Sequence, residues 1–145
     1  MDEPAATLDD PRLTLAGLFF ETHDGLTAHL SRRLEADFGM AHQTFEVLLR
    51  LARSPEQRLR LSDLAAQVTM SASGLSRAVD RLERDGLVAR VDCPTDRRSV
   101  YAALTDAGRD RVDELLPAHL EHLEEEFTSP LDASERGALP PAVVG

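Results

Sequence analysis

The chain has 145 residues, of which 42% are hydrophobic and 29% are charged, and its formal net charge is −10. This length and composition predict one globular domain with its own core and exclude a disordered chain. No apolar run is long enough to cross a bilayer, the acidic N-terminus is unlike a signal peptide, and there is a single cysteine, so we expect a cytoplasmic protein without a membrane partner.

The charges are unevenly distributed along the sequence. Residues 1–49 sum to −6 (3 basic, 9 acidic) and residues 100–145 to −7 (3 basic, 10 acidic), whereas residues 50–99 sum to +3 (10 basic, 7 acidic). All 16 basic residues are arginines, which stay charged at any working pH and can pair with phosphate or guanine through two hydrogen bonds. The acidic total therefore does not exclude a nucleic-acid partner.

The N-terminal third is predicted to be helical. Residues 1–11 contain two prolines and are expected to form a loose arm. Residues 12–38 carry apolar residues at helical spacing, and Gly39 is a natural end to that helix. A second helix is expected over residues 43–53, before the sequence Ser54-Pro55.

Three shorter elements are predicted next. Residues 58–61 alternate between arginine and leucine, as a very short strand does. Ser62 is expected to cap a helix over residues 63–68, and Ser71 to cap a longer helix over residues 72–85.

The remaining sequence predicts a hairpin and a long helix. Residues 87–91 and 99–104 are predicted strands, and the turn-forming residues 93–96 between them complete a β-hairpin. Thr105 is expected to cap a long helix over residues 106–139.

This order of elements is typical of a winged helix–turn–helix, a mainly α fold with a small β-hairpin (α+β). We expect a single domain over residues 1–145, in which about 42–105 form a DNA-binding lobe. The outer helices, 12–38 and 106–139, carry more apolar residues than one small core can cover, so we expect them to form a dimerisation module. The residues concerned are Leu15, Phe19, Leu26, Leu30, Leu116, Leu120, Leu123 and Phe127. Pro140-Pro141 should break the last helix.

The helix over residues 72–85 has two distinct faces at 100° per residue. Its core face holds Leu75, Ala78, Val79 and Leu82, and its opposite face holds Ser73, Arg77, Asp80 and Arg84. Because the N-terminal end of such a helix enters the major groove, the candidate DNA-binding residues are Ser71, Ser73, Gly74 and Arg77, with Arg81 on the flank. The alternative is an exposed face closed by ion pairs of Asp80 with Arg77 and Arg84, which we favour for Arg84.

The tip of the predicted hairpin is basic. Arg97 and Arg98 lie between the strands, where an arginine can enter the narrow minor groove of DNA. Asp96 is expected to turn the loop and to orient Arg98 by a charge-assisted bond. The alternative is an ordinary solvated turn.

These segments together resemble the MarR family of transcriptional regulators. The resemblance is carried by Leu61-Ser-Asp-Leu-Ala, Ser71-x-Ser-Gly-Leu-Ser-Arg-x-Val-Asp-Arg-Leu-Glu, Gly86-Leu-Val-x-Arg and the wing pattern Asp96-x-Arg98-x5-Leu104-Thr105-x-x-Gly108. It covers about residues 12–127. It implies an obligate homodimer in which each subunit offers one winged helix to a half-site of a pseudo-palindromic operator. It also implies Ser71, Ser73, Gly74 and Arg77 in the major groove and Arg98, with Arg97, at the minor groove.

The resemblance further implies a repressor that a small effector releases from DNA. Regulators of this kind often bind an anionic or phenolic ligand between the dimer module and the DNA-binding lobe. The candidate wall residues are Phe19, His23, His42 and Phe45. The alternative is that the phenylalanines belong to the core and that the histidines are surface or hydrogen-bonded residues.

No motif indicates an enzyme or a cofactor, since the sequence has no phosphate loop, nucleophile elbow or glycine-rich cofactor turn. His119 and His122, with His42 or His23, could bind zinc, but the run of glutamates around them indicates a solvated face, and we expect no metal. Cys93 is interpreted as a small turn residue. The rival function is a winged-helix module that binds another protein instead of DNA.

Overall fold

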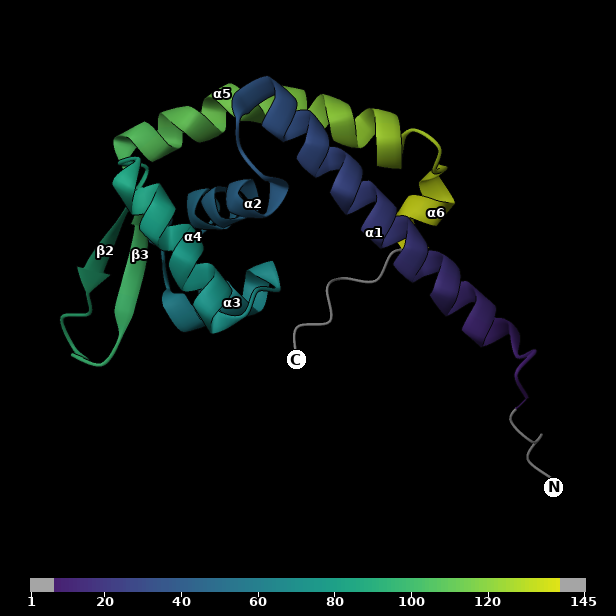
Figure 1. The fold of residues 1–145 in the computed structure, drawn as a ribbon, viewed down its shortest axis with the longest axis horizontal. Coiled ribbons are helices and arrows are strands. Elements are labelled where there is room, and N and C mark those ends of the chain that lie inside the picture. The colour runs from purple at the N-terminus through teal and green to yellow at the C-terminus, as the bar shows by residue number, and fades with distance from the viewer. Residues whose placement is uncertain (1–6, 139–145) are drawn as a thin grey trace.

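The computed structural model describes residues 7–138 and confirms a winged helix–turn–helix (Figure 1). In chain order the elements are α1 (Pro11–Phe38), α2 (His42–Ala52), η1 (Pro55–Gln57), β1 (Arg58–Arg60), α3 (Leu61–Val68), α4 (Ala72–Arg84), β2 (Val88–Asp92), β3 (Val100–Leu104), α5 (Asp106–Leu123), η2 (Glu124–Thr128) and α6 (Ala133–Ala138). The predicted helix over residues 106–139 is wrong in its last part, because the helical segment ends at Thr128 and a turn over residues 129–132 separates it from the short α6. Pro130 lies in this turn, and a proline cannot continue a helix. The expected break at Pro140-Pro141 and most of the predicted arm lie outside the described residues.

Helix α1 is bounded by local signals at both ends. The Asp10 side chain accepts a hydrogen bond from the backbone N–H of Arg12, and Pro11 occupies the first helical turn, where its missing N–H is not needed. At the other end Gly39 takes a left-handed conformation with φ of 66°, which a glycine adopts without strain. The helix predicted over residues 12–38 is thereby confirmed.

One predicted cap is wrong. Ser62 was expected to precede its helix, but α3 begins at Leu61, and Arg60 is the N-cap residue without a side-chain cap bond. The reason is that β1 runs directly into α3, so Arg60 is both the last strand residue and the extended residue that a helix start requires. Ser62 therefore lies inside the first turn.

The other two predicted caps are confirmed. Ser71 Oγ accepts the backbone N–H of Gly74 at 3.0 Å at the start of α4. Thr105 Oγ1 accepts the backbone N–H of Gly108 at 3.0 Å at the start of α5. Both helices therefore begin at the residue that the sequence indicates.

The sheet has three antiparallel strands in the order β1–β3–β2. The hairpin pairs Val91 of β2 with Tyr101 of β3, and the short β1 pairs Leu59 with Ala102 on the other side of β3. The wing is thus fixed to the helical part through β1, which leads into α3.

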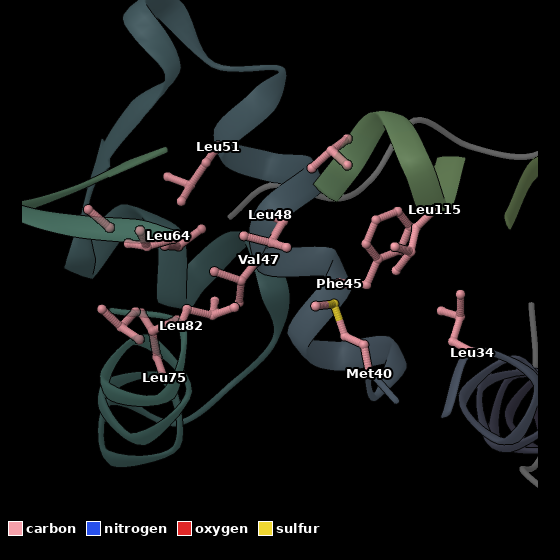
Figure 2. Close-up of a cluster of buried hydrophobic side chains, with 14 residues drawn as sticks. Leu34, Met40, Phe45, Val47, Leu48, Leu51, Leu64, Leu75, Leu82 and Leu115 are labelled. Carbon is pink, nitrogen blue, oxygen red and sulfur yellow. The ribbon is translucent and has the colours of Figure 1, made fainter. Parts of the chain in front are cut away.

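The core is centred on α2 (Figure 2). Phe45, Val47, Leu48 and Leu51 of this helix are fully buried. Around them pack buried residues of α1, the α1–α2 loop, α3, α4, β2, β3 and α5, namely Leu34, Met40, Leu64, Leu75, Val79, Leu82, Val88, Ala102, Val112 and Leu115. The predicted core face of α4 is confirmed, since Leu75, Ala78, Val79 and Leu82 are all buried.

The N-terminal half of α1 lies outside this core and extends away from the lobe (Figure 1). Leu15 is 70% exposed, Phe19 61% and Phe20 63%, and only Leu30 and Leu34 of α1 are buried. Leu120 of α5 is also exposed. Within residues 7–138, no helix has the length and apolarity that crossing a membrane would require.

A tight junction joins the wing to α5. The Thr105 hydroxyl donates to the carbonyl oxygen of Gly86 at 2.6 Å, and the Thr105 N–H donates to the carbonyl of Leu87 at 3.1 Å. A Cβ added to the buried Gly108 would overlap the Leu87 carbonyl oxygen and lie 2.7 Å from Leu104 Cδ1. Only glycine therefore fits beneath the hairpin at this position.

We expect Gly108→Ala to destabilise the protein by about 1–3 kcal/mol or more, because the added methyl group overlaps backbone that cannot move without opening the junction. Gly25→Ala is the matched control, since Gly25 lies in α1 with nothing within 4 Å of an added Cβ. Alanine there should be neutral or stabilise by about 0.5–1 kcal/mol. Urea unfolding measures both, and equal stabilities for the two variants would contradict the predicted overlap.

Candidate nucleic-acid interface

The start of α4 presents small polar groups at an exposed helix terminus. The hydroxyls of Ser71 and Ser73 lie 3.4 Å apart, and both residues are exposed. Gly74 is half-buried under the Ser71 cap, and an added Cβ would lie 3.0 Å from Ser71 Oγ. Small residues here leave the positive end of the helix dipole open to a close anionic partner.

The arginines of α4 have no ion-pair partners within residues 7–138. Arg77, Arg81 and Arg84 are exposed, and none of them forms an ion pair within the described part of the chain. The favoured pairing of Asp80 with Arg84 is wrong, and so is the alternative pairing with Arg77, because Asp80 Oδ1 binds Arg90 Nη2 of β2 at 2.7 Å. The guanidinium groups on this face are therefore available to a ligand.

Arg90 ties the wing to α4 and was missed as a functional residue. Besides Asp80, its guanidinium lies 3.7 Å from the Glu83 carboxylate and 3.5 Å from the carbonyl oxygen of Ser76. Its backbone N–H also donates to Glu83 Oε2 at 3.0 Å. The only available signal was the arginine that ends the pattern Gly86-Leu-Val-x-Arg. Arg90 sets the position of the wing against the helix.

Asp96 organises the wing tip, as expected, by turning the loop and forming a charge-assisted bond with Arg98. Its carboxylate accepts the backbone N–H of Arg98 at 3.0 Å and the hydroxyl of Ser99 at 2.8 Å. These bonds, the one from Arg98 first, hold the pKa of Asp96 below its ordinary value. Asp96 thus orients Arg98 through its backbone N–H and not through its guanidinium. Arg97 and Arg98 are both exposed without an ion pair among the described residues.

A basic hollow beside the wing extends this surface. Arg60 and Arg98 line a depression of about 230 Å³ together with Ser62 and Ser99. Arg60 Nε donates to the hydroxyl of Tyr101 at 3.2 Å, and its guanidinium lies 5.8 Å from the centre of that ring. Arg60 could not be predicted as a site residue from the sequence, because its proximity to the wing depends on the β1–β3 pairing.

The structure brings together two of the four candidate effector-pocket residues. His23 of α1 and His42 of α2 line a shared hollow of about 260 Å³ with Thr27 and Glu46 among others. Phe45 is fully buried in the core with its ring against His119, at 5.0 Å between centroids. Phe19 lies on the exposed part of α1, with its ring edge-on to Phe20.

The expectation that the α5 histidines belong to a solvated face is wrong. His119 and His122 are each only 3% exposed, because α5 turns this side toward α1 and α2. Burial first, and then the neighbouring His42 and His122, lower the pKa of His119 to about 4, so its imidazole is neutral. Burial likewise lowers the pKa of His42. Cys93 lies in the turn, with Sγ 3.3 Å from Thr95 Oγ1.

The two basic features lie on one side of the lobe. Figure 1 shows the tip of the β2–β3 hairpin at the end of the lobe away from α5. The C-terminal end of α4 leads into β2, and its N-terminal end lies toward the same side of the lobe as the hairpin tip. A helix N-terminus and a basic wing arranged in this way define a winged helix–turn–helix DNA-binding protein.

The comparisons with known proteins agree with this class. A sequence profile described as MarR family matches residues 38–99. The chain is 31% identical to the HTH-type transcriptional regulator YkoM of Bacillus subtilis over 74% of this chain and 68% of that protein. It is 27% identical to the HTH-type transcriptional repressor YetL of Bacillus subtilis over 81% and 70%. The structure matches Sco3205, a MarR family transcriptional regulator from Streptomyces coelicolor in complex with DNA, with 35% identity and a TM-score of 0.83 over 96% and 86% of the chains.

The chain belongs to the MarR family of transcriptional regulators. Its relatives and its fold are those of DNA-binding regulators and not of enzymes.

We expect Asp80→Asn and Arg90→Gln each to lower the free energy of unfolding by up to about 1 kcal/mol, because the pair is only partly exposed and joins two elements. The double variant should lose less than the sum of the two. Urea unfolding of all four proteins measures this coupling. Strict additivity would show that the ion pair contributes nothing to holding the wing.

Proposed function

We propose that this protein represses transcription by binding a pseudo-palindromic operator as a homodimer, with one winged helix in each half-site. The observation that carries the proposal is the set of unpaired arginines on α4 and at the wing tip. An exposed guanidinium that is free of internal partners can form two hydrogen bonds to guanine or phosphate without first breaking an ion pair. A repressor role is supported by similarity to YetL, which is named as a repressor.

The start of α4 is proposed to enter the major groove. Ser71, Ser73 and Gly74 would approach the DNA backbone closely, and Arg77 would reach a base edge one turn later, with Arg81 beside it. The wing would place Arg98 at the minor groove with Arg97 next to it, on a loop whose shape Asp96 sets. A protein-binding winged helix without DNA contacts has less support, because an unpaired arginine cluster is expensive to desolvate against an apolar partner.

The dimer is proposed to form through the outer helices. The apolar stripe of α1, with Leu15, Phe19 and Phe20 more than half exposed, needs a cover that residues 7–138 do not supply. A symmetric second copy supplies it and places two lobes about 34 Å apart, one turn of DNA. In this proposal residues 12–38 and 106–139 form the dimer module of a single domain, and about 42–105 form the lobe.

Release by a small effector is also proposed. The hollow lined by His23 and His42 lies between α1, which belongs to the proposed dimer module, and α2, which belongs to the lobe. A ligand bound there would change the angle between the two modules and hence the spacing of the half-sites. We propose a cytoplasmic location for this activity.

Operator binding is tested with DNA from upstream of the protein's own gene by fluorescence anisotropy at several salt concentrations. We expect affinity to fall steeply as salt rises, and Arg77→Ala to weaken specific binding by about 10–100-fold. Arg98→Ala should weaken it less and reduce the salt slope by about 1. Arg109→Ala is the matched control, since this exposed arginine of α5 is paired with Asp113 and lies away from the wing tip. Equal losses for Arg77→Ala and Arg109→Ala would refute the proposed surface.

The dimer is tested separately by light scattering. We expect twice the mass of one chain for the wild type and a single-chain mass for Phe19→Asp, because a carboxylate on the apolar stripe of α1 would have to be buried unpaired. Glu21→Lys, which changes an exposed residue two positions after Phe19 on the opposite face of the same helix, should remain dimeric. A monomeric wild-type protein would refute the dimer.

A further inference from the structure

Two buried histidines of α5 and one half-buried histidine of α2 gather where the two helices pack together. The side chain of His42 is 14% exposed, and His119 and His122 are 3% exposed. The rings of His42 and His119 lie 5.6 Å apart between centroids, with 30° between their planes. Within the described residues, the Nδ1 atoms of all three histidines are buried without a hydrogen-bond partner. Buried polar atoms are normally satisfied, so this cluster calls for a ligand.

A carboxylate completes part of the cluster. Glu46 lies one helical turn after His42, and its Oε1 is 3.9 Å from His42 Nε2, which is too far for a hydrogen bond. His122 is directed elsewhere, with Nε2 3.8 Å from Asp37 Oδ2 of α1. The remaining three residues, His42, Glu46 and His119, each offer a donor atom within 4.8 Å of the other two.

This donor set is one that zinc uses. Two imidazoles and one carboxylate hold zinc in sites that keep a fourth position for water. Bonds of about 2.1 Å place tetrahedral ligands about 3.4 Å apart, so side-chain rotations that draw the donors inward by about an ångström would close the site. Both α2 donors are half-buried at the wall of the hollow of about 260 Å³, which gives an ion a path from solvent and leaves space for the water.

We propose that His42, Glu46 and His119 bind one divalent transition-metal ion of the zinc class per chain. Neutral imidazoles are the form that binds metal, and an ion would give the two unpartnered rings the contact that they lack. Because His42 and Glu46 belong to α2 and His119 to α5, the ion would join the centre of the lobe to the helix that leads out of it.

Titration of the tag-free protein with Co²⁺, followed by displacement with Zn²⁺, tests the site. We expect one equivalent of Co²⁺ to give the intense visible absorption of a four-coordinate ion, and Zn²⁺ to remove it. Glu46→Gln and His119→Gln should weaken binding by at least the roughly 10–100-fold that the loss of an outer-shell partner costs. His29→Gln is the matched control, a more exposed histidine of α1 that faces Glu126 at 3.2 Å, and it should bind as the wild type does.

Circular dichroism establishes that each variant is folded. Glu46 is partly exposed, so Glu46→Gln remains informative if the buried His119→Gln unfolds. Failure of the folded wild type to bind Co²⁺ or Zn²⁺, or equal affinity of the wild type and Glu46→Gln, would overturn the proposal. The titration contains no DNA, so its outcome is independent of operator binding.

Discussion

The burial of α2 is the constraint on which the rest of the fold depends. This helix of 11 residues contacts α1, α3, α5, β1 and β3, and four of its residues are buried. Apolar residues such as Phe45 and Leu51 have to be buried on several sides. The positions of the neighbouring helices and strands are therefore set by their packing against α2. Helix α4 completes the same cluster through Leu75, Val79 and Leu82, while its contacts run to α3 and β2. The exposed face of α4 is therefore held by a core that lies behind it.

The polar residues of the lobe act on the backbone and on one another in a consistent way. Ser71, Asp96 and Thr105 each use a short side chain to accept a nearby N–H, which fixes a helix start or a turn. These bonds shape the surface without involving the long side chains on it. A surface that is ordered before binding loses less conformational entropy on binding. Less of the binding free energy of the few groups that reach the ligand is therefore offset by the cost of ordering.

The elements and the core face of α4 could be predicted because they depend on local periodicity and caps. Contacts between residues that are distant in the sequence could not be predicted in this way. Asp80 has arginines at i−3 and i+4, and the local rule favours those pairs, but β2 brings Arg90 to 2.7 Å. His119 lies among acidic residues in sequence, and its burial follows from the packing of α5 on α2. Phe45 could be either a pocket wall or a core residue until the position of α5 was known.

The ion pair of Asp80 with Arg90 helps to explain how a chain with a net charge of −10 keeps a basic surface on its lobe. A dimer of this chain would carry −20, so long-range attraction to DNA is weak and a few close contacts must supply the affinity. An acidic residue on α4 would ordinarily pair with the arginines of that helix and so weaken their interaction with an anionic partner. Asp80 forms its ion pair with Arg90 instead, on the side of α4 that faces the wing. The ion pair thus has two effects, since it fixes the wing and keeps the Asp80 carboxylate from pairing with Arg77 or Arg84. Loss of Arg90 would free a carboxylate beside both of them, so we expect Arg90 to influence the proposed DNA contacts without touching DNA.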